Sequence, residues 1–234
     1  MPRRSTTVCL AAALCLPATG CAAGADFGDT GVDPSEANGR LQGRVQVKVG
    51  RRVKPDHSGV VVVLQGVPGE PPDATNVVHE IRQIDKTFVP EVSVVLEGTT
   101  VSFPNDDRVY HNVFSNSRAA TFDLGSYKSG TTKEVQLKRP GVVEVFCNVH
   151  PDMAAKVLVV DTAYYDATDR AGRFSIRQIP PGTYKYQAWQ AWGPAIKGKV
   201  TIEPGETTEL NLTLSETKKP LHRKKDGSDY GRYQ

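Results

Sequence analysis

The side chains best suited to chemistry in this chain form a set of metal ligands. Cys147, His150 and Met153 lie within one seven-residue segment, and His111 precedes the cysteine by 36 residues. The soft thiolate and thioether favour Cu(I), and imidazole nitrogens suit both copper oxidation states. Two histidines and a cysteine with a weak axial methionine are the ligands of a blue copper centre. The segment therefore predicts one mononuclear type 1 copper site.

The scarcity of sulfur-containing residues favours this interpretation over a coincidence. The chain has four cysteines and two methionines, and Met153 is the only methionine besides the initiator. Cys9, Cys15 and Cys21 all lie near the N-terminus, so Cys147 is the only thiol in the rest of the chain. Alone, a buried cysteine or methionine usually fills a core. Together in one short loop with a histidine, they indicate a metal site.

The first 25 residues have the layout of a secretory signal peptide. Arg3 and Arg4 precede a short apolar run from Val8 to Leu16, and small residues follow it. The run is too short to span a bilayer. Residues 18–21 resemble a lipoprotein box that would anchor the protein to a membrane through Cys21, although Ala18 stands where leucine is usual. Ordinary cleavage after Ala25 is the alternative. We therefore expect a soluble or lipid-anchored protein in the periplasm or cell envelope of a bacterium.

The rest of the chain reads as short strands separated by turns. Alternating valines at 45, 47 and 49 have the period of a half-buried strand, and no long helical period occurs. The continuous run Val60–Leu64 suits a strand buried on both faces. Gly, Pro and Asn pairs separate further expected strands at 92–96, 100–103, 133–137, 142–146 and 156–160. The fold class predicted is all-β, a sandwich or barrel.

The C-terminal third carries a recognisable series of turns and strands. Thr168–Ile176, Ile179–Tyr184 and Val200–Leu214 contain "TDRAGRFSI", "IPPGTY" and "PGETTELNL". This series resembles the carboxypeptidase regulatory-like domain, a small transthyretin-like β-sandwich. The opening strands of that family match the segments starting at Leu41 and Ser58.

This resemblance implies a discontinuous domain. We expect a signal peptide at 1–25, a linker at 26–40, the regulatory-like sandwich at 41–68 plus 162–215, and a disordered basic tail at 216–234. Residues 69–161 would be inserted between the two parts of the sandwich. The alternative is two consecutive domains, with residues 41–67 belonging to the copper domain.

The segment around the ligands resembles a cupredoxin of the plastocyanin and amicyanin group. Phe103-Pro104-Asn105, followed by His111-Asn112-Val113, matches the motif of the first histidine, and the Cys-x2-His-x2-Met loop has the amicyanin spacing. The resemblance implies a Greek-key sandwich with three equatorial ligands and an axial Met153. It implies that Asn112 ties the two ligand loops together. It also places Phe146 and Pro151 around the site. Asp152 departs from the family, because it stands where an apolar or aromatic residue often follows His-Pro, and an ionised Asp152 beside the site would lower the reduction potential.

The remaining histidines and tryptophans are interpreted as structural. We expect His57, His79 and His222 to be surface residues, and Trp189 and Trp192 to fill or flank the C-terminal sandwich.

Two functions fit these residues. The first is a one-electron carrier that cycles Cu(II)/Cu(I) with protein partners; the second is a non-redox copper-binding or copper-delivery protein. Five histidines and one candidate thiol cannot supply a multicopper enzyme, and no Cys-x-x-Cys-His haem motif occurs, so we expect no enzyme activity. No basic stripe with interleaved aromatics occurs, which argues against nucleic-acid binding.

Overall fold

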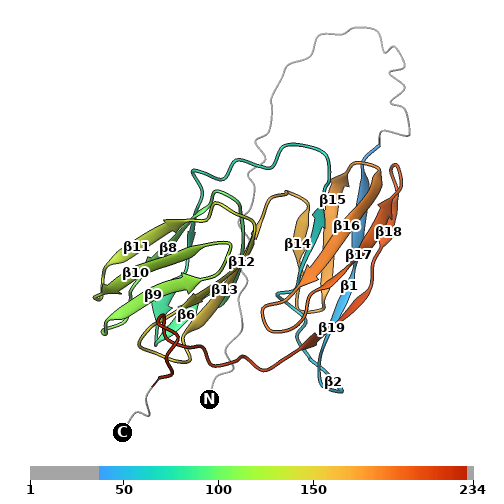
Figure 1. Cartoon of the computed structure of the whole chain (residues 1–234). Coiled ribbons are helices and arrows are strands. Elements are labelled where there is room, and N and C mark those ends of the chain that lie inside the picture. Colours follow the sequence, from blue (N-terminus) through green and yellow to red (C-terminus); the bar gives the residue numbers. More distant parts are fainter. Residues whose placement is uncertain (1–36, 231–234) are drawn as a thin grey trace.

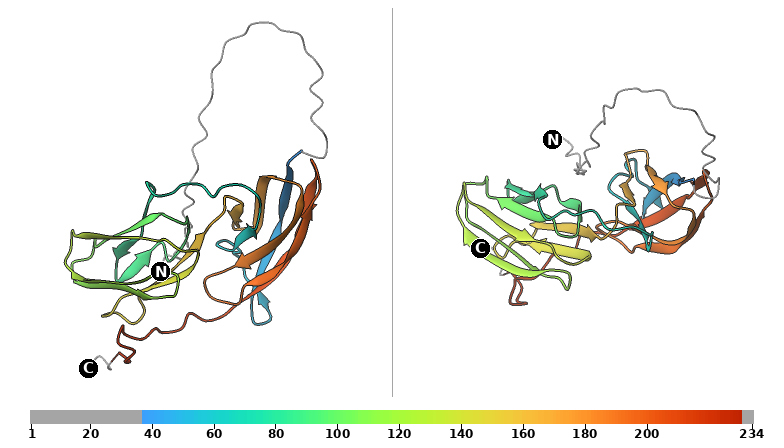
Figure 2. Two further views of the ribbon diagram at one scale, coloured as in Figure 1. Left: turned by 45° about the horizontal axis from the view of Figure 1, so that its top comes forward. Right: turned by 90° about the horizontal axis from the view of Figure 1, so that it is seen from above.

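The protein consists of two β-sandwiches that lie side by side (Figures 1 and 2). The computed structural model describes residues 37–230; the predicted signal peptide, Cys21 and most of the predicted linker lie outside this range. Every regular element within it is a strand, so the all-β class is confirmed. None of the described elements is a helix long and apolar enough to cross a bilayer.

One of the two sandwiches, which we call the flanking sandwich, is built from both ends of the described chain. Its first sheet pairs β1 with β2, β15, β18 and β19, and its second has the order β14-β3-β16-β17. Strands before residue 69 therefore share sheets with strands after residue 162, as a discontinuous sandwich requires. Its strands are β1 (Gly39–Val49), β2 (Arg52–Val53), β3 (Val61–Gln65), β14 (Tyr165–Ala167), β15 (Arg173–Ile179), β16 (Gly182–Trp189), β17 (Ile196–Ile202), β18 (Thr207–Glu209) and β19 (Leu212–Glu216).

The other sandwich, which we call the site sandwich because it holds the predicted ligands, lies between these two parts in sequence. One sheet has the order β10-β9-β12-β13-β7, a second has β11-β8-β4, and β5 and β6 form a hairpin. A single apolar core fills the space between the sheets and includes Phe103, Cys147 and Met153. Its strands are β4 (Val78–Glu80), β5 (Arg82–Ile84), β6 (Thr87–Val89), β7 (Val92–Leu96), β8 (Thr100–Pro104), β9 (His111–Asn116), β10 (Thr121–Tyr127), β11 (Thr132–Gln136), β12 (Gly141–Phe146) and β13 (Ala154–Val160).

Strand β3 joins the two sandwiches because both of its faces are apolar. Val62 and Leu64 point into the core of the flanking sandwich, whereas Val61 and Val63 belong to a separate apolar cluster. That cluster also holds Val94 of β7, Leu158 of β13 and Trp189, so it forms the interface between the sandwiches. Trp192 packs against the same cluster. The two tryptophans thus flank the C-terminal sandwich on the side that faces the site.

All three histidines expected at the surface are at least half-buried, and His222 is described below with the C-terminal segment that holds it. His79 on β4 is 8% exposed, and its Nε2 lies 2.8 Å from Ser93 Oγ. His57 is half-buried and accepts a hydrogen bond from the backbone N–H of Val47 at 3.0 Å. The surface interpretation was wrong for these residues because a histidine in a loop or short strand carries no sequence signal for its tertiary partner.

Burial of His79 makes stability depend on pH. Burial lowers the pKa of the imidazole, against a smaller opposing effect of Glu80, so the folded state favours the neutral ring. The resulting stability is fully present above the unfolded pKa of about 6.5 and is lost as pH falls below it. We expect the free energy of unfolding to fall between pH 7.5 and 5 by at most about 1.4 kcal/mol per pH unit, the limit for one proton. Urea unfolding of the wild type and His79→Gln measures this, and an equal pH dependence in both would contradict it.

Candidate metal centre

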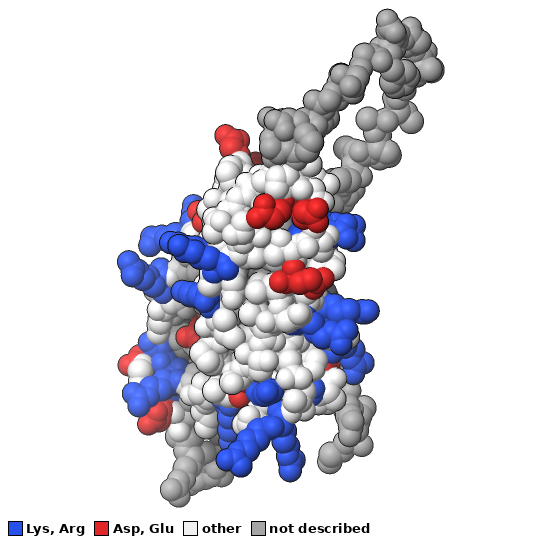
Figure 3. Space-filling model, turned by 90° about the vertical axis from the view of Figure 1, so that its right-hand side faces the viewer, with Lys and Arg blue, Asp and Glu red and all other residues white. Residues whose placement is uncertain are grey.

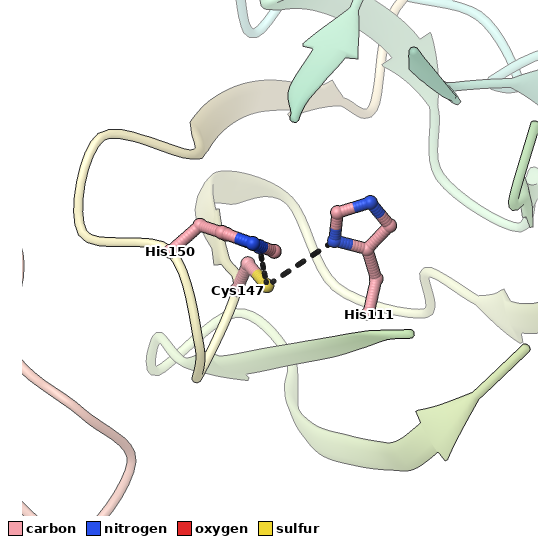
Figure 4. Close-up of side chains that lie close together, drawn as sticks. All are labelled: His111, Cys147 and His150. Carbon is pink, nitrogen blue, oxygen red and sulfur yellow. Dashed lines mark hydrogen bonds between the residues drawn. The ribbon is translucent and has the colours of Figure 1, made fainter. Parts of the chain in front are cut away.

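Three of the four predicted ligands meet at one point of the site sandwich. The Sγ atom of Cys147 lies 3.7 Å from Nδ1 of His111 and 3.5 Å from Nδ1 of His150. One ligand atom from each of these residues lies within 4.8 Å of the others. Figure 4 shows both rings turned toward the sulfur. Cys147 and His111 are fully buried, and His150 is half-buried.

The three groups that meet here can form only weak hydrogen bonds with one another. Nε2 of His111 lies 2.7 Å from Oδ2 of Asp107, and a carboxylate can only accept, so the ring proton lies on Nε2. In a neutral His111, Nδ1 then carries a lone pair that faces the sulfur. A thiol has one hydrogen and can donate to only one of the two imidazoles that face it, so the other ring must donate from Nδ1 to the weakly accepting sulfur. A cation bound by the sulfur and both nitrogens would satisfy all three groups.

The spacing of the ligand atoms fits a metal ion. A metal bonded to sulfur at about 2.3 Å and to nitrogen at about 2.0–2.1 Å, at trigonal or tetrahedral angles, places the two ligand atoms roughly 3.5–3.8 Å apart. The observed Sγ–Nδ1 distances of 3.5 and 3.7 Å are close to this range. The two sulfur–nitrogen distances therefore suit a bound metal ion, and a cysteine with two histidines is a donor set whose chemistry fits copper and also zinc.

The turn between β12 and β13 holds Cys147, His150 and Met153. Phe146 and Ala154 are paired across the two strands, so residues 147–153 form the connecting loop, which we call the metal loop. Within it the N–H of Cys147 donates to the carbonyl of Met153, and the N–H of Met153 donates to the carbonyl of His150. Met153 is fully buried in the same core as Cys147. The loop is therefore folded back on itself by its own backbone hydrogen bonds.

Strand register brings His111 to this loop. β9 and β12 are antiparallel and pair Phe114 with Phe146. Because His111 lies three residues before Phe114 and Cys147 follows Phe146, the start of β9 lies beside the metal loop. The sequence analysis placed no strand at 111–116, yet His111 opens strand β9. This pairing brings His111 beside Cys147, although the two residues are 36 positions apart in the sequence.

The loop before His111 is organised by Asn105, the asparagine of the Phe-Pro-Asn motif. Its buried side-chain amide donates to the carbonyls of Val109 and Tyr127, and its Oδ1 accepts from the N–H of Asp107. These bonds satisfy polar backbone groups that would otherwise lie unpaired in the fold. The motif therefore fixes the path of the chain into His111.

Asp107 is a site residue that the sequence analysis missed. Besides His111, its carboxylate accepts the N–H groups of Asp85 at 2.6 Å and Lys86 at 2.8 Å. Both residues have positive φ, 51° and 56°, and form the two-residue turn of the β5–β6 hairpin. Burial opposes ionisation of Asp107, but the hydrogen bonds from Lys86, His111 and Asp85 outweigh it and lower its pKa. The only sequence signal was an acidic residue four positions before the histidine.

Among the four residues expected around the ligands, Asn112 has a partner other than the one expected. Asn112 donates to Asp123 Oδ1 on β10 at 2.7 Å, so its amide ties β9 to β10 and not one ligand loop to the other. Its buried Oδ1 has no hydrogen-bond partner. Phe146 is half-buried beside Phe114, with ring centroids 5.8 Å apart. Pro151 is half-buried and Asp152 is exposed at the outer side of the metal loop.

The loops around His150 leave apolar side chains in solvent. Val109 and Tyr110, just before His111, are 40% and 63% exposed, and Val149, just before His150, is 40% exposed. Burial, the nearby His111 ring and Lys86 lower the pKa of His150, against Asp107, so its neutral form is favoured. Neutral imidazole is the form that binds a metal. His150, the predicted ligand with the most access to solvent, thus lies near the exposed apolar side chains of Val109, Tyr110 and Val149.

Comparison with known proteins matches one part of this chain to a protein family. Residues 150–215 match the family model of the carboxypeptidase regulatory-like domain, which is less than half of the chain. The match begins inside the metal loop, whereas strand pairing assigns β13 to the site sandwich and β14–β19 to the flanking one. The comparison with curated proteins gives no match.

Solved structures similar to this chain include several cupredoxins. A purple cupredoxin from Nitrosopumilus maritimus is 25% identical with a TM-score of 0.32, covering 35% of this chain and 98% of that protein. A reduced amicyanin variant is 21% identical with a TM-score of 0.34, covering 42% and 98%. A copper-containing nitrite reductase from Thermus scotoductus SA-01 is 21% identical with a TM-score of 0.34, covering 36% of this chain and 22% of the reductase. At these TM-scores, the case for copper depends on the ligand geometry above.

Proposed function

We propose that the protein is a type 1 copper protein that carries single electrons. The observation that carries the proposal is the convergence of two imidazole nitrogens on the buried Cys147 sulfur. His111, Cys147 and His150 would be the equatorial ligands, and the buried Met153 would supply the weak axial one. Bound copper would supply reversible exchange of one electron between Cu(II) and Cu(I).

Burial of the site and the hydrogen bonds within the metal loop favour a carrier over a delivery protein. His111, Cys147 and Met153 are fully buried, and the metal loop is held by its own hydrogen bonds. Ligands held in one arrangement need little movement when the charge changes, and buried ligands exchange their metal slowly. The described residues contain one cluster of three or more histidine, cysteine or acidic ligands, which suits a carrier with a single site.

The proposed partners are redox proteins that dock around His150. The exposed apolar side chains of Val109, Tyr110 and Val149 lie in the two loops that hold the ligands and give a surface for brief contact. On the face of the flanking sandwich in Figure 3, Lys and Arg groups stand in separate places with Asp and Glu between them. Neither sign of charge forms a continuous surface on this face. The predicted signal peptide would place the protein in the periplasm or cell envelope.

The function is tested by titrating the mature protein with Cu(II). We expect one equivalent to produce an intense visible Cys-to-copper charge-transfer band that disappears on reduction and returns on oxidation. Voltammetry should give one reversible couple. A pale product, or a band with no reversible couple, would overturn the electron-carrier proposal. Fast loss of copper to a chelator would instead favour copper delivery.

The charge of Asp152 should tune this couple. Asp152 is exposed and precedes the ligand Met153, so its carboxylate stabilises the more positive oxidised site. We expect Asp152→Asn to raise the reduction potential by roughly tens of millivolts, the size expected of one solvent-screened charge. Glu206→Gln, at an exposed position on the flanking sandwich, is the control and should leave the potential unchanged. An unchanged or lowered potential in Asp152→Asn would contradict the assignment.

A further inference from the structure

The C-terminal segment 217–230, here called the strap, lies on the site sandwich. We expected a disordered tail from residue 216, but β19 runs to Glu216 and the following residues make specific contacts. Figures 1 and 2 show this segment, in red, leaving the flanking sandwich at β19 and crossing to the site sandwich near the turn after β12. The tail prediction therefore fails for these residues.

Three residues of the strap bind the metal loop directly. The hydroxyl of Tyr230 donates to the carbonyl of Cys147 at 2.5 Å. The N–H of Lys225 donates to Oδ1 of Asn148 at 2.8 Å. Nε2 of His222 lies 3.2 Å from the carbonyl of His150. The strap thus contacts two predicted ligand residues and the residue after the cysteine, in each case away from the ligand atom itself.

Aromatic packing adds to these hydrogen bonds. The ring of His222 stacks on Phe146, the residue before Cys147, with centroids 4.5 Å apart and an interplanar angle of 21°. Tyr230 packs edge-on against His222 at 5.3 Å and 85°. His222 was expected to be a surface residue, yet it is half-buried in this stack. The strap therefore covers the side of the metal loop on which Phe146 lies.

Two lysines hold the strap along its length. Nζ of Lys225 lies 2.6 Å from Asp123, the carboxylate that also binds Asn112, and this bond is the largest cause that lowers the pKa of Asp123 to about 2. Nζ of Lys219 lies 2.8 Å from Glu91 and also donates to the carbonyl of Ala154, the residue after Met153. Exposed ion pairs contribute little each, so the aromatic and loop contacts must supply much of the docking.

We propose that Tyr230 and His222 are positioning residues of the metal centre. The metal loop has two internal backbone hydrogen bonds, and the strap adds contacts at the carbonyls of both Cys147 and His150. Fixing these carbonyls fixes the backbone from which the sulfur and the imidazole project. The strap therefore restricts movement of the two ligands and slows opening of the loop. This inference rests on the proposed copper site for its effect on the metal, but its effect on Cys147 needs no copper.

The test compares Tyr230→Phe/His222→Leu with the wild type and with Lys218→Ala. Lys218 is an exposed strap residue without a contact to the metal loop, so its replacement is the matched control. We expect the double variant to lose copper to a chelator at least about tenfold faster than the wild type, an effect of the size seen when residues that hold metal ligands in place are replaced. We also expect its visible band to shift. His222→Phe keeps a ring on Phe146 and should restore part of the slow rate. Thermal unfolding of the metal-free proteins checks that the sandwich stays folded.

A second readout separates this inference from the copper proposal. In the metal-free protein, the double variant should raise the rate at which a thiol reagent modifies Cys147 by about tenfold or more, in line with freer opening of the loop. If the wild type shows no blue band but the double variant raises the rate of Cys147 modification, the copper proposal fails and the positioning role of the strap is supported. If neither the thiol rate nor copper loss differs from Lys218→Ala, the positioning role is overturned.

Discussion

Replacing Cys147 with serine should abolish the intense visible band of the copper-loaded protein. The band needs a thiolate bonded to the metal, and Cys147 is the only cysteine in the described part of the chain. A serine hydroxyl is a harder ligand that does not ionise near neutral pH, so the site would keep two imidazoles without the sulfur. The two nitrogens that face Cys147 can bond the hydroxyl, so we expect the sandwich to fold. Absorption and electron paramagnetic resonance spectra with one equivalent of Cu(II) measure the effect.

His79→Gln is the matched control for this experiment. His79 is buried in the same sandwich, but it binds Ser93 and is not part of the ligand cluster. Its replacement should reduce the pH dependence of stability and leave the visible band intact. A band that persists in Cys147→Ser, or disappears equally in His79→Gln, would show that the spectrum does not report a Cys147 site.

Local patterns were enough to predict several of the strands and the closeness of three of the four predicted ligands. The run Val60–Leu64 predicted a strand buried on both faces, and β3 has apolar clusters on both sides. The strand 92–96 was predicted at its observed bounds. Cys147, His150 and Met153 lie in one short turn, so their proximity follows from chain connectivity. Such features depend on residues close in sequence, where period and turn residues determine the outcome.

Features that depend on distant partners could not be predicted in the same way. The strap is polar and rich in lysine, a composition that indicates disorder, and its order depends on Phe146 and Asp123 of another domain. Asp107 gave no signal beyond its spacing from His111, because its role depends on the turn of the β5–β6 hairpin. Asn112 was assigned a partner across the ligand loops, but the neighbouring strand β10 supplies Asp123 instead. In each case the tertiary contact determines the role of the residue.

Asp107→Asn should weaken copper binding by roughly 10- to 100-fold, the usual cost of losing the partner of a metal-binding histidine. The Asp107 carboxylate accepts three N–H groups, from Asp85, Lys86 and the ring of His111. An asparagine has one acceptor oxygen, and its amide NH2 cannot accept from any of these donors. At least one donor is then left unpaired, the His111 ring loses its charged partner, and the nitrogen that faces Cys147 is less firmly oriented. Competition against a chelator of known affinity measures the loss.

Asp106→Asn separates this role from a general loss of negative charge near the site. Asp106 is the neighbouring acid, but its carboxylate pairs with Arg82 at 2.7 Å on the surface and does not contact a ligand. Both variants remove one charge from the same loop, so long-range electrostatics should affect them similarly, whereas only Asp107→Asn disturbs His111. Asp107→Glu keeps the charge in a longer side chain and should retain part of the affinity. Equal affinities in Asp107→Asn and Asp106→Asn would mean that the carboxylate does not orient His111, and that Nδ1 is held toward the sulfur by packing alone.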